Sequence, residues 1–271
     1  MLRLQGEMIR GGTSKCWIFA HHDVAATGVD VDSVLLAAFN AADPRQIDGV
    51  GGATSTTSKA AIVQISAEAD VDIEYAFAQV GIGDERVEWA SNCGNCATAV
   101  ALYAVHHGLV PITSDTTTVR MRNVNTGARL TGTISTPCGI APDEGMALVP
   151  GTAAPGVPVL LGFEDPAGST TGRALPTGHA VDTLTGPEGL VEATLVDAGA
   201  PAALFEAKAF GLDGGRRPGR AGRRCGGSWS SHAAAIARQL GRVGRGRGFF
   251  FPARSRGAAR PSQPPPGRAR P

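Results

Sequence analysis

The chain has 271 residues, of which 42% are hydrophobic and 18% charged, a composition typical of a folded protein that excludes a largely disordered one. No apolar run reaches the roughly 18 residues that a membrane-spanning helix needs. Residues 1–12 also lack the apolar segment of a secretory signal. We therefore expect a cytoplasmic protein without a membrane span.

The net charge of +1 conceals two oppositely charged regions. The first 214 residues hold 11 basic and 24 acidic residues, whereas the last 57 hold 14 arginines and no acidic residue. Residues 215–271 are rich in Gly, Arg and Pro and cannot bury enough apolar surface to fold. We favour an out-of-frame translation of GC-rich DNA, because the change at Gly214 is abrupt. The alternative is an Arg-rich segment that binds nucleic acid.

Hydrophobic periodicity predicts a mixed succession of strands and helices before the basic tail. An amphipathic helix starts at Val31 and should end near Asp43 and Pro44, because the residue before proline disfavours helix. A second helix, at 96–106, is apolar all round and should be buried. Strands are expected at 2–9, 17–20, 60–66, 71–77, around 119–121 and 130, and at 146–149, 194–196 and 203–205, with 150–159 as a linker.

Cys93 is the first candidate for a reactive group. It precedes the predicted buried helix, where unpaired backbone N–H groups and the helix dipole favour negative charge. A thiol there tends toward the thiolate, and a carboxylate can also dock at such an end. The alternative is a thiol that only packs. Cys93 and Cys96 also form a C-x-x-C pair, but one pair is half a zinc site, so we predict no metal.

Lys59 is the second candidate. It is one of three lysines and follows a loop at 49–58 that is rich in Gly, Ser and Thr. Partial burial at the start of an apolar strand would suit a base, whereas an exposed loop lysine would have no role. The turn from Arg10 to Ser14 offers N–H groups and hydroxyls suited to a carboxylate. It could equally be a plain connection between strands.

Several short motifs then follow in an order that resembles the PrpF family of 2-methylaconitate cis-trans isomerases, methylitaconate isomerases and 4-oxalomesaconate tautomerases. The resemblance covers residues 5–213. Its motifs are RGGTSK at 10–15, GG at 51–52 with TSK at 57–59, NCGN at 92–95, MRNVNTG at 121–127, DPAGS at 165–169, LPTG at 175–178 and VDAGAP at 196–201.

The resemblance implies an α/β (α+β) diaminopimelate-epimerase-like fold, in which two pseudo-symmetric halves each wrap a sheet around a central helix. We expect a complete first domain at 1–155, an incomplete second domain at 156–214 and the tail at 215–271. The implied activity is a cofactor-independent isomerisation of an unsaturated di- or tricarboxylate such as 2-methylaconitate or 4-oxalomesaconate. By resemblance, Lys59 is the main acid–base residue and Cys93 lies opposite it. The expected substrate-binding residues are Arg10, Thr13, Ser14, Ser58, Asn92, Gly94 and Asn95.

The sequence departs from the family pattern in two places. Cys16 stands where members usually have Gly, and no His-Pro-Ser-Gly type motif follows, so the second half ends where the tail starts. Three alternatives therefore stay open: an inactive fragment of such an enzyme, a nucleic-acid-binding protein, and a racemase with paired thiols, for which Cys138 and Cys225 are poorly placed. The expected partner is the small carboxylate, without a membrane or nucleic acid. A homodimer is left open.

Overall fold

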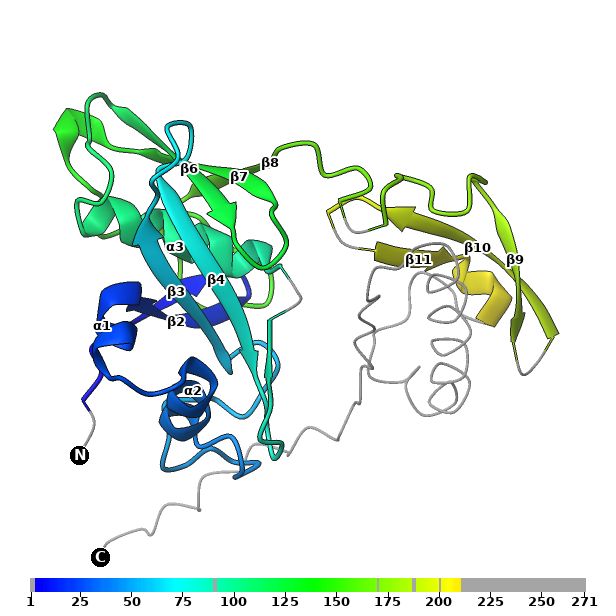
Figure 1. Ribbon diagram of the computed structural model, residues 1–271. Coiled ribbons are helices and arrows are strands. Elements are labelled where there is room, and N and C mark those ends of the chain that lie inside the picture. Colours follow the sequence, from blue (N-terminus) through cyan, green and yellow to red (C-terminus); the bar gives the residue numbers. More distant parts are fainter. Residues whose placement is uncertain (1–2, 90–91, 170, 187–188, 200, 211–271) are drawn as a thin grey trace, which may run out of the picture. The chain divides into compact units, whose positions relative to one another are not determined.

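The computed structural model describes residues 3–89, 92–169, 171–186, 189–199 and 201–210 (Figure 1). Two compact units contain them: Met1–Gly178 with Val196–Ala202, and His179–Leu195 with the chain from Ala203 onward. The predicted tail at 215–271 lies outside the described residues. Its two interpretations therefore stay predictions, as do the domain boundaries expected at 155 and 214.

The first unit holds one large mixed sheet and its helices. The sheet has the strand order β1-β2-β3-β4-β6-β7-β8, and β5 pairs with β4. The pairs β2–β3 and β4–β6 are parallel and the others antiparallel. The elements are β1 (Glu7–Gly11), β2 (Ser14–Ala20), α1 (His21–Ala26), α2 (Val31–Phe39), β3 (Lys59–Ile65), β4 (Ile73–Val80), β5 (Val87–Glu88), α3 (Gly94–His106), β6 (Thr116–Asn123), β7 (Arg129–Ser135), a 3-10 turn (Pro137–Gly139) and β8 (Val159–Phe163).

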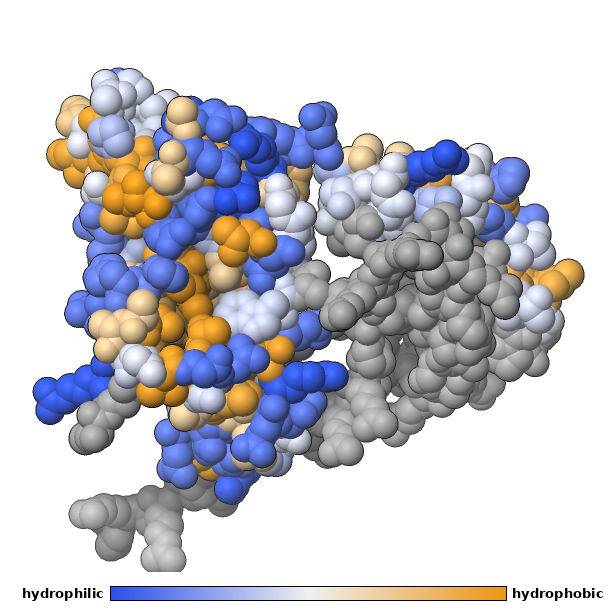
Figure 2. All heavy atoms as spheres, in the orientation of Figure 1, coloured by the Kyte–Doolittle hydropathy of each residue, from blue (hydrophilic) through white to orange (hydrophobic). Residues whose placement is uncertain are grey.

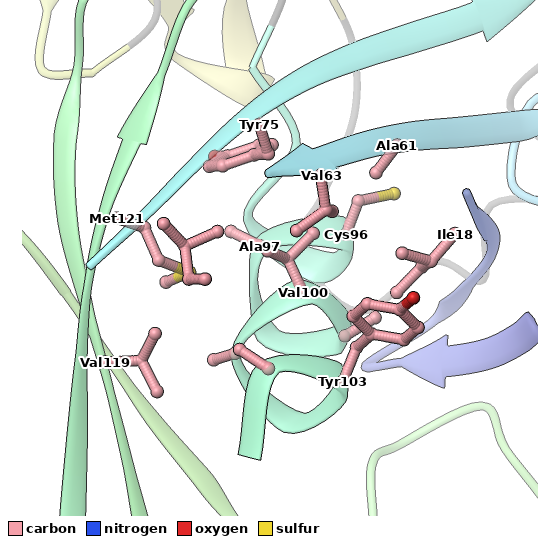
Figure 3. Close-up of a cluster of buried hydrophobic side chains, with 14 of the residues drawn as sticks. Ile18, Ala61, Val63, Tyr75, Cys96, Ala97, Val100, Tyr103, Val119 and Met121 are labelled. Carbon is pink, nitrogen blue, oxygen red and sulfur yellow. The ribbon is translucent and has the colours of Figure 1, made fainter. Parts of the chain in front are cut away.

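Helix α3 is the centre of this unit. It contacts β1, β2, β3, β4, β6, β7 and β8, so the sheet curls around it, which confirms the predicted buried helix and the expected fold of the first half. Small residues allow this close packing: a Cβ on Gly132 of β7 would lie 2.4 Å from the Ala101 Cβ of the helix. Figure 3 shows Val100 of α3 among side chains from the strands, including Ile18, Val63 and Met121.

A second apolar layer covers the other face of the sheet. Asp30 caps the N-terminus of helix α2, since its carboxylate accepts from the Ser33 N–H at 3.1 Å. The helix presents Leu35 and Phe39 to the strands. The prediction that it ends near Pro44 was wrong. Asn40 adopts the left-handed conformation (φ 51°) and ends it earlier, as Asn often does at a helix end. Figure 2 shows hydrophobic residues at the surface over β3 and β4, beside α1 and α2.

Further differences from the predicted elements concern short segments: the strand expected at 2–9 starts only at Glu7, and strand β5 and a strand at Asp182–Gly186 were not predicted. The strand expected at 146–149 is only an isolated bridge between Ala147 and Gly156. Strand β8 was not predicted, and it extends the main sheet by pairing with β7. Helix α1 was also missed. It starts with two histidines and buries a single apolar residue, Val24, so its sequence shows no helical hydrophobic pattern.

The remaining strands form a separate three-stranded sheet. Its order is β11-β10-β9, built from β9 (Asp182–Gly186), β10 (Gly189–Asp197) and β11 (Pro201–Phe205), and a 3-10 turn (Ala207–Phe210) follows. Leu184, Ala193 and Leu195 are its buried core. Strands β10 and β11 confirm the strands predicted at 194–196 and 203–205. In the described part of the chain, no helix is long and apolar enough to cross a membrane.

Candidate active site

The N-terminus of α3 offers backbone N–H groups to a ligand. Cys93 is the N-cap, with extended backbone and no side-chain hydrogen bond that caps the helix. Its carbonyl accepts from the Ala97 N–H at 2.9 Å, so the helical pattern starts there. The N–H groups of Gly94 and Asn95 belong to the first turn, which has no preceding carbonyls to satisfy it. This end of the helix attracts an anion such as a carboxylate.

The turn between β1 and β2 packs directly on that helix end. The Asn95 side-chain amide donates to Thr13 Oγ1 at 3.0 Å and to Ser14 Oγ at 3.2 Å. The two glycines of the turn make this approach feasible, since a Cβ on Gly11 would lie 1.8 Å from the Asn95 carbonyl oxygen and one on Gly12 2.2 Å from Asn95 Oδ1. Three predicted substrate-binding residues are thus brought together at α3.

Arg10 lies at the same turn but is held by backbone groups. Its guanidinium donates to the Gly12 carbonyl at 2.9 Å and to the Ala154 carbonyl at 3.0 Å. The side chain therefore ties the turn to the segment that precedes β8. Its predicted contact with substrate stays a prediction.

Lys59 is the first residue of β3 and lies next to a firmly held loop. The buried Gln46 accepts from the Ala53 N–H at 2.9 Å, accepts from the Ser58 hydroxyl, and donates to the Gly81 carbonyl at 3.0 Å. Ser58 is fully buried, and its hydroxyl is directed at Gln46. We therefore assign Ser58 an anchoring role for the loop, and its predicted carboxylate contact stays a prediction.

The side chain of Lys59 has two partners on β4. Its Nζ donates to Gln79 Oε1 at 2.7 Å and lies 4.9 Å from the centre of the Phe77 ring. The charge of Lys59 also acts to lower the pKa of the Cys93 thiol, against the larger raising effects of a hydrogen bond with Cys96 and of burial.

The expectation that Cys93 tends toward the thiolate was wrong. Its pKa is raised well above the ordinary value, first because its thiol hydrogen-bonds to Cys96 and second because it is buried. The pKa of Cys96 is also raised, mainly by a hydrogen bond with Cys16. Burial and thiol–thiol contacts thus outweigh the helix end and the Lys59 charge. A protonated Cys93 can give a proton but cannot act as a nucleophile.

Asn92 is held in one orientation by two buried neighbours. Its Oδ1 accepts from the Tyr75 hydroxyl at 3.1 Å and from Asn123 Nδ2 at 3.2 Å. Asn123 is itself oriented, because its Oδ1 accepts the N–H groups of Asn125 and Thr126. This leaves Asn92 Nδ2 as the remaining donor, a buried atom that has no partner among the residues that the structure describes. Buried polar groups are nearly always hydrogen-bonded, to protein or to ordered water, so this donor is a candidate contact for a ligand or water oxygen.

Sequence reasoning missed Gln46, Tyr75, Gln79 and Asn123. Asn123 lies inside the MRNVNTG motif, so a signal for it existed, although we named no site residue in that motif. The neighbouring histidines at the end of α3 contact other parts of the chain. His106 contacts the Pro142 carbonyl at 2.9 Å, and His107 contacts Glu7 at 2.7 Å. In the described ranges no cluster of three or more His, Cys, Asp or Glu side chains could hold a metal ion.

Two solved structures share this fold. A crystal structure of a methylitaconate Δ-isomerase is 32% identical to the chain, with a TM-score of 0.72, and the match covers 88% of this chain and 62% of that one. A hydroxyproline epimerase from Agrobacterium vitis shares the fold at 12% identity and a TM-score of 0.50, covering 86% and 60%. The fold is therefore that of the diaminopimelate-epimerase-like α/β proteins, as expected.

Within that fold class, the chain belongs to the PrpF family, whose model, described as "PrpF protein", matches residues 1–218. It is 39% identical over 207 residues to a 4-oxalomesaconate tautomerase of Pseudomonas putida, covering 76% of this chain and 56% of that protein. It is 36% identical over 217 residues to a 3-methylitaconate isomerase of Eubacterium barkeri, covering 80% and 57%. The chain thus spans little more than half the length of these relatives.

Proposed function

We propose that the protein is an isomerase that moves a proton on an unsaturated di- or tricarboxylate, with Lys59 as the base. The observation that carries the proposal is the set of anion-binding donors where the β1–β2 turn packs on the N-terminus of α3, next to the Cys93 N-cap. The charge of Lys59 acts on the Cys93 thiol, which supports Lys59 as the base that serves this site. The relatives named for methylitaconate and 4-oxalomesaconate support this substrate class.

Substrate carboxylates bind first in this proposal. The N–H groups of Gly94 and Asn95 and the hydroxyls of Thr13 and Ser14 surround one carboxylate, which the helix dipole stabilises. The oriented Asn92 amide donates to a second oxygen of the substrate. The carboxylate oxygens accept hydrogen bonds from all of these donors, so the site needs no positively charged side chain to bind the substrate.

The proton transfer then uses the substrate's own conjugation. Lys59 takes a proton from a carbon next to the double bond, and the electron pair moves into the conjugated carboxylate as an enolate-like anion. The donors at α3 stabilise that anion because they already point at the carboxylate. The proton returns at a different carbon, from the Lys59 ammonium or from the Cys93 thiol. One C–H bond breaks and one forms, so the reaction consumes no co-substrate and needs no cofactor.

Proton NMR in D₂O tests this proposal. The chain, treated with EDTA, is incubated separately with 3-methylitaconate, 2-methylaconitate and 4-oxalomesaconate. We expect migration or rotation of the double bond, or deuterium uptake next to it, for at least one acid. No change in any of the three acids would contradict the proposed activity, and activity that returns only with added metal would contradict the cofactor-free reaction.

A further inference from the structure

Lys59 and Gln79 are directly opposite each other across β3 and β4. They are register partners in the antiparallel pair, so their side chains leave the same face of the sheet. Lys59 Nζ donates to Gln79 Oε1 at 2.7 Å. A lysine side chain is a flexible chain of four carbons, and without such a partner its amine would sample many positions.

The orientation of the Gln79 amide is fixed by a second hydrogen bond. Gln79 Nε2 donates to the Ser58 carbonyl at 2.9 Å, and a carbonyl can only accept. The amide oxygen must therefore face Lys59. Ser58 is buried and held in turn by Gln46, so a continuous set of contacts runs from the loop through Gln79 to the lysine amine.

Phe77 supports the amine from another side. Its ring centre lies 4.9 Å from Lys59 Nζ, a distance at which an ammonium ion is attracted to the aromatic face. Asn125 fixes the backbone of Phe77, because its side chain accepts the Phe77 N–H at 2.7 Å and donates to the Phe77 carbonyl at 3.2 Å. The backbone that carries the Phe77 ring is therefore held in place beside the Lys59 amine.

Both partners of the amine are neutral. In the described part of the chain Lys59 forms no ion pair, although arginines and carboxylates form seven elsewhere in it. A carboxylate at this position would hold the lysine as the ammonium ion, which cannot accept a proton. An amide oxygen accepts a hydrogen bond from the amine and from the ammonium alike. The nitrogen can then stay in place before and after it takes a proton.

We propose that Gln79 is the positioning residue for Lys59: it holds the amine at one point while leaving it free to change its protonation state. The inference deepens the proposed isomerase activity and rests on it for the reaction. The contact between the two side chains can be tested without turnover.

The test uses the three lysines of the chain. With ¹³Cε-labelled lysine, Lys15, Lys59 and Lys208 give three methylene signals, which Lys15→Arg and Lys208→Arg assign. We expect the Lys59 methylene to be ordered in the unsubstituted chain, mobile in Gln79→Met, and ordered in Gln79→Glu. Gln64→Met is the matched control, because Gln64 lies on β3 with Lys59 but contacts Glu74. This variant should leave the Lys59 methylene ordered. If Gln79→Met fails to fold, Gln79→Asn replaces it, since the shorter amide cannot reach both partners.

Turnover then separates positioning from protonation. Gln79→Met should lower kcat by about 10- to 100-fold, as misplacement of a catalytic group does, with KM changed by no more than about 3-fold. Gln79→Glu should also lower kcat although its lysine stays ordered, because the ion pair keeps the ammonium. An equally ordered Lys59 in Gln79→Met, or unchanged kcat, would overturn the inference. If the unsubstituted chain isomerises none of the acids, the proposed function falls, and the lysine signals still decide whether Gln79 holds Lys59.

Discussion

The Asn95 side chain donates to Thr13 Oγ1 at 3.0 Å, although the two residues lie 82 positions apart in the sequence. This contact joins the first turn of the central helix to the turn between the first two strands. Both segments carry predicted substrate-binding residues. One amide side chain therefore assembles much of the candidate carboxylate site.

Gly12 of that turn should tolerate a side chain poorly, because Asn95, held by Thr13 and Ser14, lies against it. Gly12 has a φ of 57°, and a Cβ there would also lie 2.2 Å from Asn95 Oδ1. Gly28 is the matched control: its φ is 64°, but nothing lies within 4 Å. We expect Gly12→Ala to destabilise the fold by about 1–3 kcal/mol more than Gly28→Ala, the cost of an overpacked contact. Urea unfolding measures this difference. Adding Asn95→Ala should remove it, and equal losses for the two alanine variants would contradict the packing described.

The raised pKa of Cys93 predicts a slowly reacting thiol. Only the thiolate reacts with iodoacetamide, and burial and the Cys96 contact disfavour that form. The exposed Cys138 is the internal reference. At pH 7.5 we expect Cys93 to be alkylated at least about 10-fold more slowly than Cys138, as followed by mass spectrometry of the peptides. Faster labelling of Cys93 than of Cys138 would show that the helix end does produce a thiolate.

The orientation of Asn92 predicts a role for Asn123 in substrate affinity. An Asn123→Asp side chain still accepts the Asn125 and Thr126 N–H groups but cannot donate to Asn92, whose amide would then turn its NH₂ group inward. We expect KM to rise about 10-fold, the value of one well-placed hydrogen bond to a charged group, with a smaller effect on kcat. Tyr75→Phe should be milder, because Asn123 alone still orients Asn92. Steady-state kinetics decide, and an unchanged KM in Asn123→Asp would exclude Asn92 as a donor.

Acid should weaken the sheet through Asp72. The hydrogen bond from Arg120, at 2.6 Å, lowers the pKa of this carboxyl below its usual value of 3.8. Because the folded-state pKa is depressed, the stabilisation is present above about pH 4 and is lost as the pH falls through the folded-state value. Arg120→Gln should reduce the difference in unfolding free energy between pH 6 and pH 3. Arg86→Gln, which removes an exposed pair with Asp84, is the control. An equal pH dependence in both variants would refute this role.

Local pattern predicted the elements whose signal lies in one segment. The apolar run at 96–106 could only be a buried helix, and the alternation at 71–77 matched β4. Strand β8 was missed because it is half exposed and becomes a strand only by pairing with β7. The same holds for the site. The loops before Lys59 and around Cys93 indicated these two residues as candidates. The contact of Gln79 with Lys59 follows from the register of β3 and β4, and the protonated state of Cys93 follows from contacts between thiols, so neither could be predicted from a local segment.

The most direct test of the proposed mechanism compares two lysines of this chain. Deuterium uptake into 3-methylitaconate, 2-methylaconitate and 4-oxalomesaconate is measured by NMR for the chain, for Lys59→Ala and for Lys208→Ala, with circular dichroism to verify folding. If Lys59 is the base, Lys59→Ala should lose at least about 100-fold in rate, the lower range for a positioned acid–base group, and Lys208→Ala should stay at the original rate. A folded Lys59→Ala protein that exchanges protons at the rate of the unsubstituted chain would contradict the account.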